Sequence, residues 1–141
     1  MLATRLKEEA LMPTSVPVTP NLIENYRTFV GDEKIDEIIR LAKPLKDARV
    51  LHVNSTSYGG GVAEILGSFI PLLQDLGIEA DWKTIEASPD FFNVTKNMHN
   101  AMQGMYIPWT AAMVDIWQQT NRTNAEGITG HYDYVYIHDP Q

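Results

Sequence analysis

Three consecutive glycines stand where a short apolar run gives way to a helical pattern. Gly59, Gly60 and Gly61 follow the run 50–53 and a few small polar residues, and Val62 opens the helical pattern. Glycine accepts positive φ and leaves no side chain between the backbone and a ligand, while the first turn of a helix presents unpaired N–H groups. The order of strand, glycine turn and helix therefore predicts a site for a phosphate or sugar oxygen.

The carboxylate of Glu64 separates this turn from the dinucleotide fingerprint G-x-G-x-x-G. Gly59 and Gly61 fill the first two glycine places of that fingerprint, but Glu64 holds the third. The third glycine allows close packing of helix on strand, and a negative charge there would also lie near a pyrophosphate. A carboxylate in this place suits sugar hydroxyls better. The alternative is a plain tight turn, with Glu64 favoured at the helix N-terminus by the helix dipole.

A second candidate site is a stripe of polar side chains on the helix expected after Ser88. Lys96, His99, Asn100 and Gln103 recur at i, i+3, i+4 and i+7, which places them on one helical face. Only Lys96 carries a fixed charge, and the neutral amides and imidazole can both donate to and accept from sugar hydroxyls. A solvated helix face is the commoner explanation of such a stripe.

The third group of candidates follows the apolar run 134–137, which is typical of a buried parallel strand. His138, Asp139 and Gln141 come directly after that run. In open α/β sheets ligands bind outside the carboxyl ends of the strands, so we expect these residues on the same edge as the glycine turn. The alternative for His138 is a strand-end histidine bonded to the backbone.

The elements that would position these residues alternate between strands and helices. Apolar periodicity predicts strands near 50–53, 78–86 and 134–137, and helices over 21–29, 32–42, 62–76, 89–103 and 111–126. Asn21, Ser88 and Thr110 are expected N-caps, and Gly77 an expected C-terminal cap. The fold class is therefore α/β, a Rossmann-like parallel sheet with helices on both faces. Three prolines within 13–20 predict an extended N-terminal arm over residues 1–20, followed by a partial Rossmann-like domain over 21–141.

Composition narrows the classes of protein. The chain has 141 residues, of which 44% are hydrophobic and 21% charged, as in globular domains. A net charge of −7 argues against nucleic acid as a partner, because binders of phosphate backbones need a basic surface. The lack of cysteine excludes thiol chemistry and suits the cytoplasm, which is the expected location. No secretory signal or apolar run of membrane length is present, so we expect a soluble chain without a membrane partner.

Four separated motifs together resemble one family. They are Leu51-His52-Val53-Asn54-Ser55-Thr56, Gly59-Gly60-Gly61-Val62-Ala63-Glu64, His99-Asn100-Ala101-Met102-Gln103-Gly104 and His138-Asp139-Pro140-Gln141. In this order they are similar to the N-terminal domain of trehalose synthase of the glycosyltransferring type, in retaining glycosyltransferase family 4. The resemblance extends from about residue 16 to residue 141.

The resemblance implies a GT-B fold of two Rossmann-like domains, of which this chain holds part of the N-terminal, acceptor-side one. Members transfer glucose from a nucleoside diphosphate glucose to glucose and form trehalose with retained configuration. The implied partners are therefore these sugars and a C-terminal donor-binding domain absent from the 141 residues. No cofactor is implied, and Mg²⁺ has no support in the sequence. A homodimer stays open as a further partner. We expect this chain alone to be inactive, because half of the cleft is missing.

Roles for individual residues follow from the same resemblance. Gly59, Gly60 and Gly61 would form the loop facing the donor diphosphate. The sugar-binding residues would be Glu64, His99, Asn100, Gln103, His138, Asp139 and Gln141. No residue is assigned as catalytic and none as a metal ligand, since catalysis in the family rests on positioning and electrostatic stabilisation.

Three other functions stay open at this point. The first is a trehalose phosphorylase of the same family, and the second a sugar- or nucleotide-binding domain without chemistry. The third is an NAD-dependent oxidoreductase, because Glu86 ends the second predicted strand where a ribose-binding acid would lie. Glu64 in the third glycine place counts against that last alternative.

Overall fold

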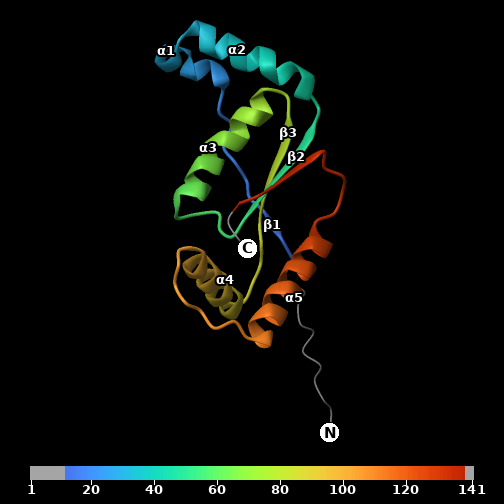
Figure 1. Ribbon diagram of the computed structural model, residues 1–141. Helices are drawn as coiled ribbons and strands as arrows, with labels where there is room; N and C mark the ends of the chain where they lie inside the picture. The colour runs from blue at the N-terminus through green and yellow to red at the C-terminus, as the bar shows by residue number, and fades with distance from the viewer. Residues whose placement is uncertain (1–11, 139–141) are drawn as a thin grey trace. The chain divides into compact units, whose positions relative to one another are not determined.

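The computed structural model describes residues 12–138 and contains a four-stranded mixed sheet. The strands lie in the order β1 (Thr14–Ser15), β3 (Glu79–Thr84), β2 (Arg49–Asn54) and β4 (Tyr134–Ile137). The α/β fold class predicted from the sequence is confirmed, and the arrangement is consistent with a Rossmann-like N-terminal domain (Figure 1).

Strands β3, β2 and β4 are parallel, as the alternating pattern predicts. Val50 pairs with Ala80 of β3 on one side and with Tyr134 of β4 on the other. The sequence did not predict β1, in which the proline-rich arm pairs antiparallel with β3 through Thr14 and Thr84. Prolines exclude a helix there, but they do not exclude a short strand at the edge of a sheet.

Helix α3 (Gly61–Asp75) covers one face of the sheet (Figure 1). The predicted apolar face of α3 buries Ala63, Leu66 and Ile70 against Val50 and Trp82 of the strands. At the end of α3, Gly77 adopts φ +83° and its N–H donates to the Gln74 carbonyl, so the predicted glycine cap is confirmed. This packing fixes the N-terminal turn of α3 above the carboxyl end of β2.

Before β2 the chain forms short helical elements. They are η1 (Ile23–Tyr26), α1 (Arg27–Val30), α2 (Asp32–Ala42) and η2 (Lys43–Leu45). The predicted cap at Asn21 is wrong, because Leu22 takes the N-cap position and the Asn21 Nδ2–H donates to the hydroxyl of Tyr26 at 2.9 Å. The side chain of an asparagine before a helix can bond to another nearby group instead of capping the helix. Here its Nδ2–H donates to the hydroxyl of Tyr26.

The chain divides into two compact units, which we describe separately. Among the described residues, one holds 14–85 and 129–138 and contains the sheet, and the other holds 12–13 and 86–128. In the second unit α4 (Pro89–Met102) begins at the predicted Ser88 cap, and α5 (Ala111–Gly127) begins at the predicted Thr110 cap. The separation of an arm over 1–20 from a domain over 21–141 stays a prediction.

Within residues 12–138 no helix is long and apolar enough to cross a membrane.

Candidate functional site

The glycine turn between β2 and α3 has the backbone that the sequence predicts at two of its three glycines. Gly59 adopts φ +69° and Gly60 φ +92°, whereas Gly61 is the first residue of α3 and has an ordinary φ. A Cβ atom added at any of the three would meet nothing within 4 Å. The glycines are therefore required by backbone conformation and not by crowding, and the space in front of the turn is open.

The N-terminus of α3 opens onto that space. Gly60 takes the N-cap position, and no side chain caps the helix there. The N–H groups of the first turn thus have no helical acceptor, and they carry the positive end of the helix dipole. Glu64 lies exposed in the same first turn. The turn can bind an anionic or hydroxyl oxygen through its backbone, with a carboxylate beside it for a second hydroxyl.

A series of hydrogen bonds links the start of the turn to the buried end of β2. Asn54, the last residue of β2, is 1% exposed, and its Oδ1 accepts from the Nε1–H of Trp82 on β3 at 2.7 Å. The Nδ2–H of Asn54 donates to the Thr56 carbonyl at 2.7 Å, and the Thr56 hydroxyl donates to the Tyr58 carbonyl at 2.8 Å. The start of the glycine turn is therefore tied to the core of the sheet.

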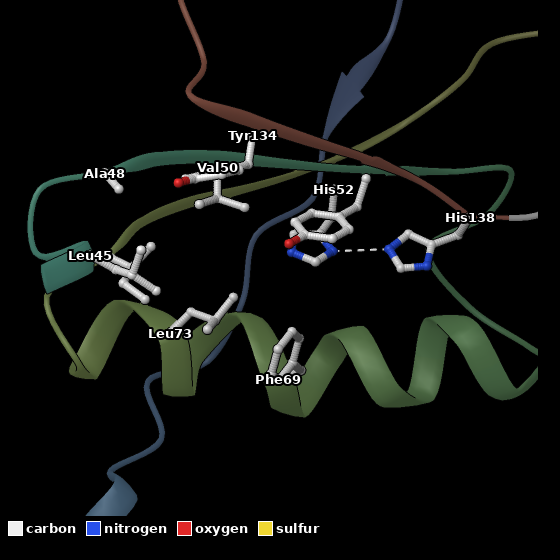
Figure 2. Close-up of a pocket in the computed structure, with 10 residues that line it drawn as sticks. Leu45, Ala48, Val50, His52, Phe69, Leu73, Tyr134 and His138 are labelled. Carbon is white, nitrogen blue, oxygen red and sulfur yellow. Dashed lines mark hydrogen bonds between the residues drawn. The ribbon is translucent and has the colours of Figure 1, made fainter. Parts of the chain in front are cut away.

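His138 follows β4 at the same edge of the sheet as Asn54, as predicted. Its backbone N–H donates to the Val53 carbonyl at 2.8 Å, which extends the ladder between β2 and β4. Its ring lies 2.9 Å from a second histidine, between Nε2 of His138 and Nδ1 of His52 (Figure 2). The alternative of a histidine bonded to the backbone thus accounts for the N–H of His138, while the ring has a partner of its own.

His52 is the residue that the sequence reasoning missed. It is 4% exposed on β2, stacked on the ring of Tyr136 at a centroid distance of 4.9 Å, with Phe69 edge-on at 5.8 Å. The signal that could have found His52 is the parallel pairing of β2 and β4. In that pairing His52 and His138 fall on the same face of neighbouring strands.

Burial determines the protonation of His52. Desolvation, with a smaller contribution from His138, lowers its pKa from 6.5 to about 4. His52 is therefore a neutral imidazole at pH 7 and can either donate to or accept from His138. A neutral His52 can orient the His138 ring without adding charge to the site.

The polar stripe forms on α4 as its spacing predicts. His99 and Gln103 are exposed, and the Gln103 amide N–H donates to Nε2 of His99 at 2.9 Å. Asn100 is half-buried, and its backbone carbonyl accepts from the N–H groups of Gln103 and Met105. Gly104 has φ +95° and ends the helix, as expected. The stripe and the glycine turn belong to different units, so their meeting in one cleft stays a prediction.

Two predicted site residues, Asp139 and Gln141, lie outside the described residues. Among residues 12–138 no group of three or more histidine, aspartate and glutamate side chains could hold a metal ion. The sheet unit therefore brings His52 of β2 beside His138 after β4, and the glycine turn with Glu64 follows the carboxyl end of β2. This is the place where open α/β sheets bind ligands.

Comparison with known proteins places this chain in a family. The model of the N-terminal domain of trehalose synthase matches residues 52–141. A trehalose synthase of Thermococcus litoralis is 50% identical over 121 residues, and one of Rubrobacter xylanophilus is 42% identical over 122 residues. A trehalose phosphorylase of Pleurotus pulmonarius is 35% identical over 132 residues. Each match covers 84% of this chain.

The relatives are much longer than this chain. The matched region makes up 29% of the two trehalose synthases and 18% of the phosphorylase.

Proposed function

Because the chain belongs to the trehalose synthase family through its N-terminal domain, we propose that its full-length parent transfers glucose from a nucleoside diphosphate glucose to glucose and forms trehalose. The family match over residues 52–141 carries this proposal, since it contains the glycine turn, the polar stripe and His138. In the proposed reaction the anomeric configuration is retained, and the parent has two Rossmann-like domains of the GT-B type.

The glycine turn is proposed as the part that faces the donor. Its first-turn N–H groups and the positive end of the α3 dipole stabilise negative charge on the leaving diphosphate, which grows as the glycosidic bond breaks. The positive φ of Gly59 and Gly60 and the open space before them support this role. The buried Asn54 keeps the N–H groups of the turn in place before the nucleotide sugar binds.

The acceptor glucose is proposed to meet hydrogen-bonding side chains, of which Glu64 and Asp139 are carboxylates. His138 and the carboxylate of Glu64 lie with the glycine turn in the sheet unit, and Asp139 and Gln141 follow His138 along the chain. His99, Asn100 and Gln103 complete the acceptor side in this proposal. The amide side chains can both donate to and accept from sugar hydroxyls, and the carboxylates can accept from them.

The donor nucleotide is proposed to be held mainly by a C-terminal domain beyond residue 141. The matched part of the relatives, 29% of their length, leaves room for that domain. The 141 residues alone should then form no trehalose, because donor and acceptor must be fixed together for transfer. The reaction as proposed needs no cofactor. The cysteine-free sequence supports a cytoplasmic location.

A second candidate is phosphorolysis of trehalose. Trehalose phosphorylases of Pleurotus pulmonarius, Pleurotus sajor-caju and Grifola frondosa are 34% to 35% identical to this chain, which supports this second candidate. A phosphate ion can occupy the same first-turn donors of α3 as a diphosphate would. The higher identity of the synthases, up to 50%, favours the first candidate.

One experiment separates these functions. The full-length parent is incubated with glucose and either ADP-glucose, UDP-glucose or α-glucose 1-phosphate, and trehalose is measured by ¹³C NMR, which also reports the anomers. Formation of α,α-trehalose from a nucleotide sugar supports the proposal. Formation from glucose 1-phosphate alone would make the protein a phosphorylase, and binding of sugar without turnover would leave a binding domain.

A further inference from the structure

The two histidines at the end of β2 and β4 form a directed contact between a buried ring and a half-buried one. Nδ1 of His52 lies 2.9 Å from Nε2 of His138. The ring planes are 16° apart and the ring centroids 5.2 Å apart, so the two nitrogens face each other between the rings (Figure 2). A hydrogen bond between two imidazoles needs an N–H on one ring and a lone pair on the other. One of the two histidines therefore donates and the other accepts.

The second nitrogen of His52 indicates which ring donates. Nε2 of His52 is buried and has no hydrogen-bond partner among residues 12–138. His52 is neutral at pH 7, because burial lowers its pKa, so it carries one proton on one of its two nitrogens. If His138 donated, that proton would be on Nε2, as a buried N–H without an acceptor. If His52 donates, Nε2 is a lone pair. Buried N–H groups without an acceptor are the rarer of the two, so the structure favours His52 as the donor.

This direction leaves His138 one neutral tautomer. A neutral imidazole that accepts at Nε2 carries its proton at Nδ1. The two ring nitrogens point in different directions, so Nδ1 of His138 faces away from His52 (Figure 2). The backbone of His138 is fixed as well, because its N–H donates to the Val53 carbonyl at 2.8 Å. His138 thus presents an N–H donor where β4 ends.

The surroundings of the pair contain no charge that would reverse this arrangement. Among the described residues, no carboxylate and no Lys or Arg side chain lines the space in which the two rings lie, and the other titratable groups there are the hydroxyls of Tyr134 and Tyr136. A carboxylate beside a histidine accepts its N–H and favours the charged imidazolium. His52 does the opposite, since it gives an N–H to the neighbouring ring and occupies the lone pair that a further proton would need.

We propose that His52 is a positioning residue for His138: it donates its Nδ1–H to Nε2 of His138 and holds that ring as the neutral Nδ1–H tautomer, a hydrogen-bond donor to a sugar hydroxyl oxygen. The ligand in this statement rests on the sugar-binding role proposed above for His138, whereas the tautomer rests on the geometry of the pair. In this state Nδ1 of His138 can neither accept a hydrogen bond from the sugar nor act as a general base.

The tautomers can be read by ¹⁵N NMR of the full-length parent labelled with ¹⁵N-histidine, without substrate, at about pH 8, where most imidazoles are neutral. Signals are assigned by their loss in His52→Asn, His138→Gln and His131→Gln. We expect His52 and His138 each to carry the proton at Nδ1. His131 is the control, because its Nε2 lies 3.6 Å from the Asp133 carboxylate and should keep the proton there. A His138 ring protonated at Nε2, or exchanging freely between both nitrogens, would overturn the proposal.

Two substitutions separate positioning from packing. In His52→Asn the amide Nδ2 is as many bonds from Cα as the histidine Nδ1 and can still donate to His138, whereas His52→Leu fills the space without a donor. We expect kcat/KM for glucose to fall roughly three- to tenfold in His52→Leu, the effect of one hydrogen bond, and less in His52→Asn. His138 should keep the Nδ1–H tautomer in His52→Asn and lose it in His52→Leu.

An equal loss of kcat/KM in both variants, or an unchanged His138 tautomer in His52→Leu, would assign His52 a packing role and overturn the proposal. The tautomers are measured without substrate. A parent that transfers no glucose would therefore contradict the proposed function, while the NMR comparison of the two variants would still decide whether His52 positions His138.

Discussion

The glycine turn and the polar stripe on α4 are both candidate binding surfaces, but they are built in opposite ways. The turn presents backbone groups whose positions are fixed by two positive φ angles and by the buried Asn54 beneath it. The stripe presents side chains on an exposed helical face, and its contact between His99 and Gln103 is local. A backbone site depends on the fold, and a side-chain site can be changed one residue at a time. Substitutions should therefore have large effects at the turn and small ones at the stripe.

The largest effect is expected from Gly60→Val in the full-length parent. A branched side chain resists φ +92° and also projects into the open space before α3, so the turn would lose its donors. We expect kcat/KM to fall about 100-fold or more, as for the loss of a preorganised donor elsewhere. Steady-state kinetics measure it. Gly67→Val is the control, because Gly67 has an ordinary φ and equally open surroundings; an equal loss there would point to misfolding of α3.

The next effect should be on stability, from Asn54→Ala. Removing this side chain leaves the Nε1–H of Trp82 buried without its acceptor and frees the Thr56 carbonyl. An orphaned buried donor costs about 1 to 3 kcal/mol, so we expect the free energy of unfolding to fall by roughly that amount. Urea unfolding measures it, with the exposed Asn93→Ala as the comparison. If both variants unfold alike, the turn is not anchored through Asn54.

His52 should make stability depend on pH. Its folded pKa of about 4 lies below the ordinary 6.5, so the unfolded chain binds the extra proton between these values. The stabilisation is complete above pH 6.5 and is lost as pH falls toward 4; we expect a decrease of roughly 1 to 2 kcal/mol from pH 7.5 to pH 5. In His52→Gln the urea midpoints of unfolding at pH 7.5 and pH 5 should lie closer together than in the wild type. The exposed His131→Gln should keep the slope of the wild type.

The sequence predicted most of the fold because local signals and tertiary packing agree there. The caps at Ser88 and Thr110, the glycine after α3 and the three parallel strands all formed where their patterns indicate. β1 escaped prediction because a two-residue strand has no periodicity of its own, and only the edge of β3 makes it pair. Asn21 failed as a cap because its side chain had a competing acceptor in Tyr26.

The candidate site divides in the same way. Residues whose role depends on local conformation, such as Gly59 and Gly60, could be recognised from the order of types along the chain. His52 could not be recognised in this way, because its role depends on His138, 86 positions away. The register of β4 brings Nε2 of His138 to 2.9 Å from Nδ1 of His52. A lone histidine within an apolar strand is interpreted as a core residue until the neighbouring strand is known.

The smallest effect is expected at the stripe, where Asn100→Ala tests whether a side-chain surface does more than face solvent. If Asn100 binds the acceptor, the lost hydrogen bond should cost roughly 0.5 to 1.5 kcal/mol of glucose binding and raise the acceptor KM several-fold. Saturation with donor should leave kcat nearly unchanged, because a contact made equally in the ground and transition states affects binding only. Gln119→Ala removes an exposed amide from α5 outside the stripe, and it should leave the acceptor KM alone. We expect the two variants to differ because Asn100 is half-buried on the stripe, whereas Gln119 is exposed outside it. An acceptor KM that is the same in both variants would reduce the stripe to a solvated helix face and leave the acceptor to the residues of the sheet unit.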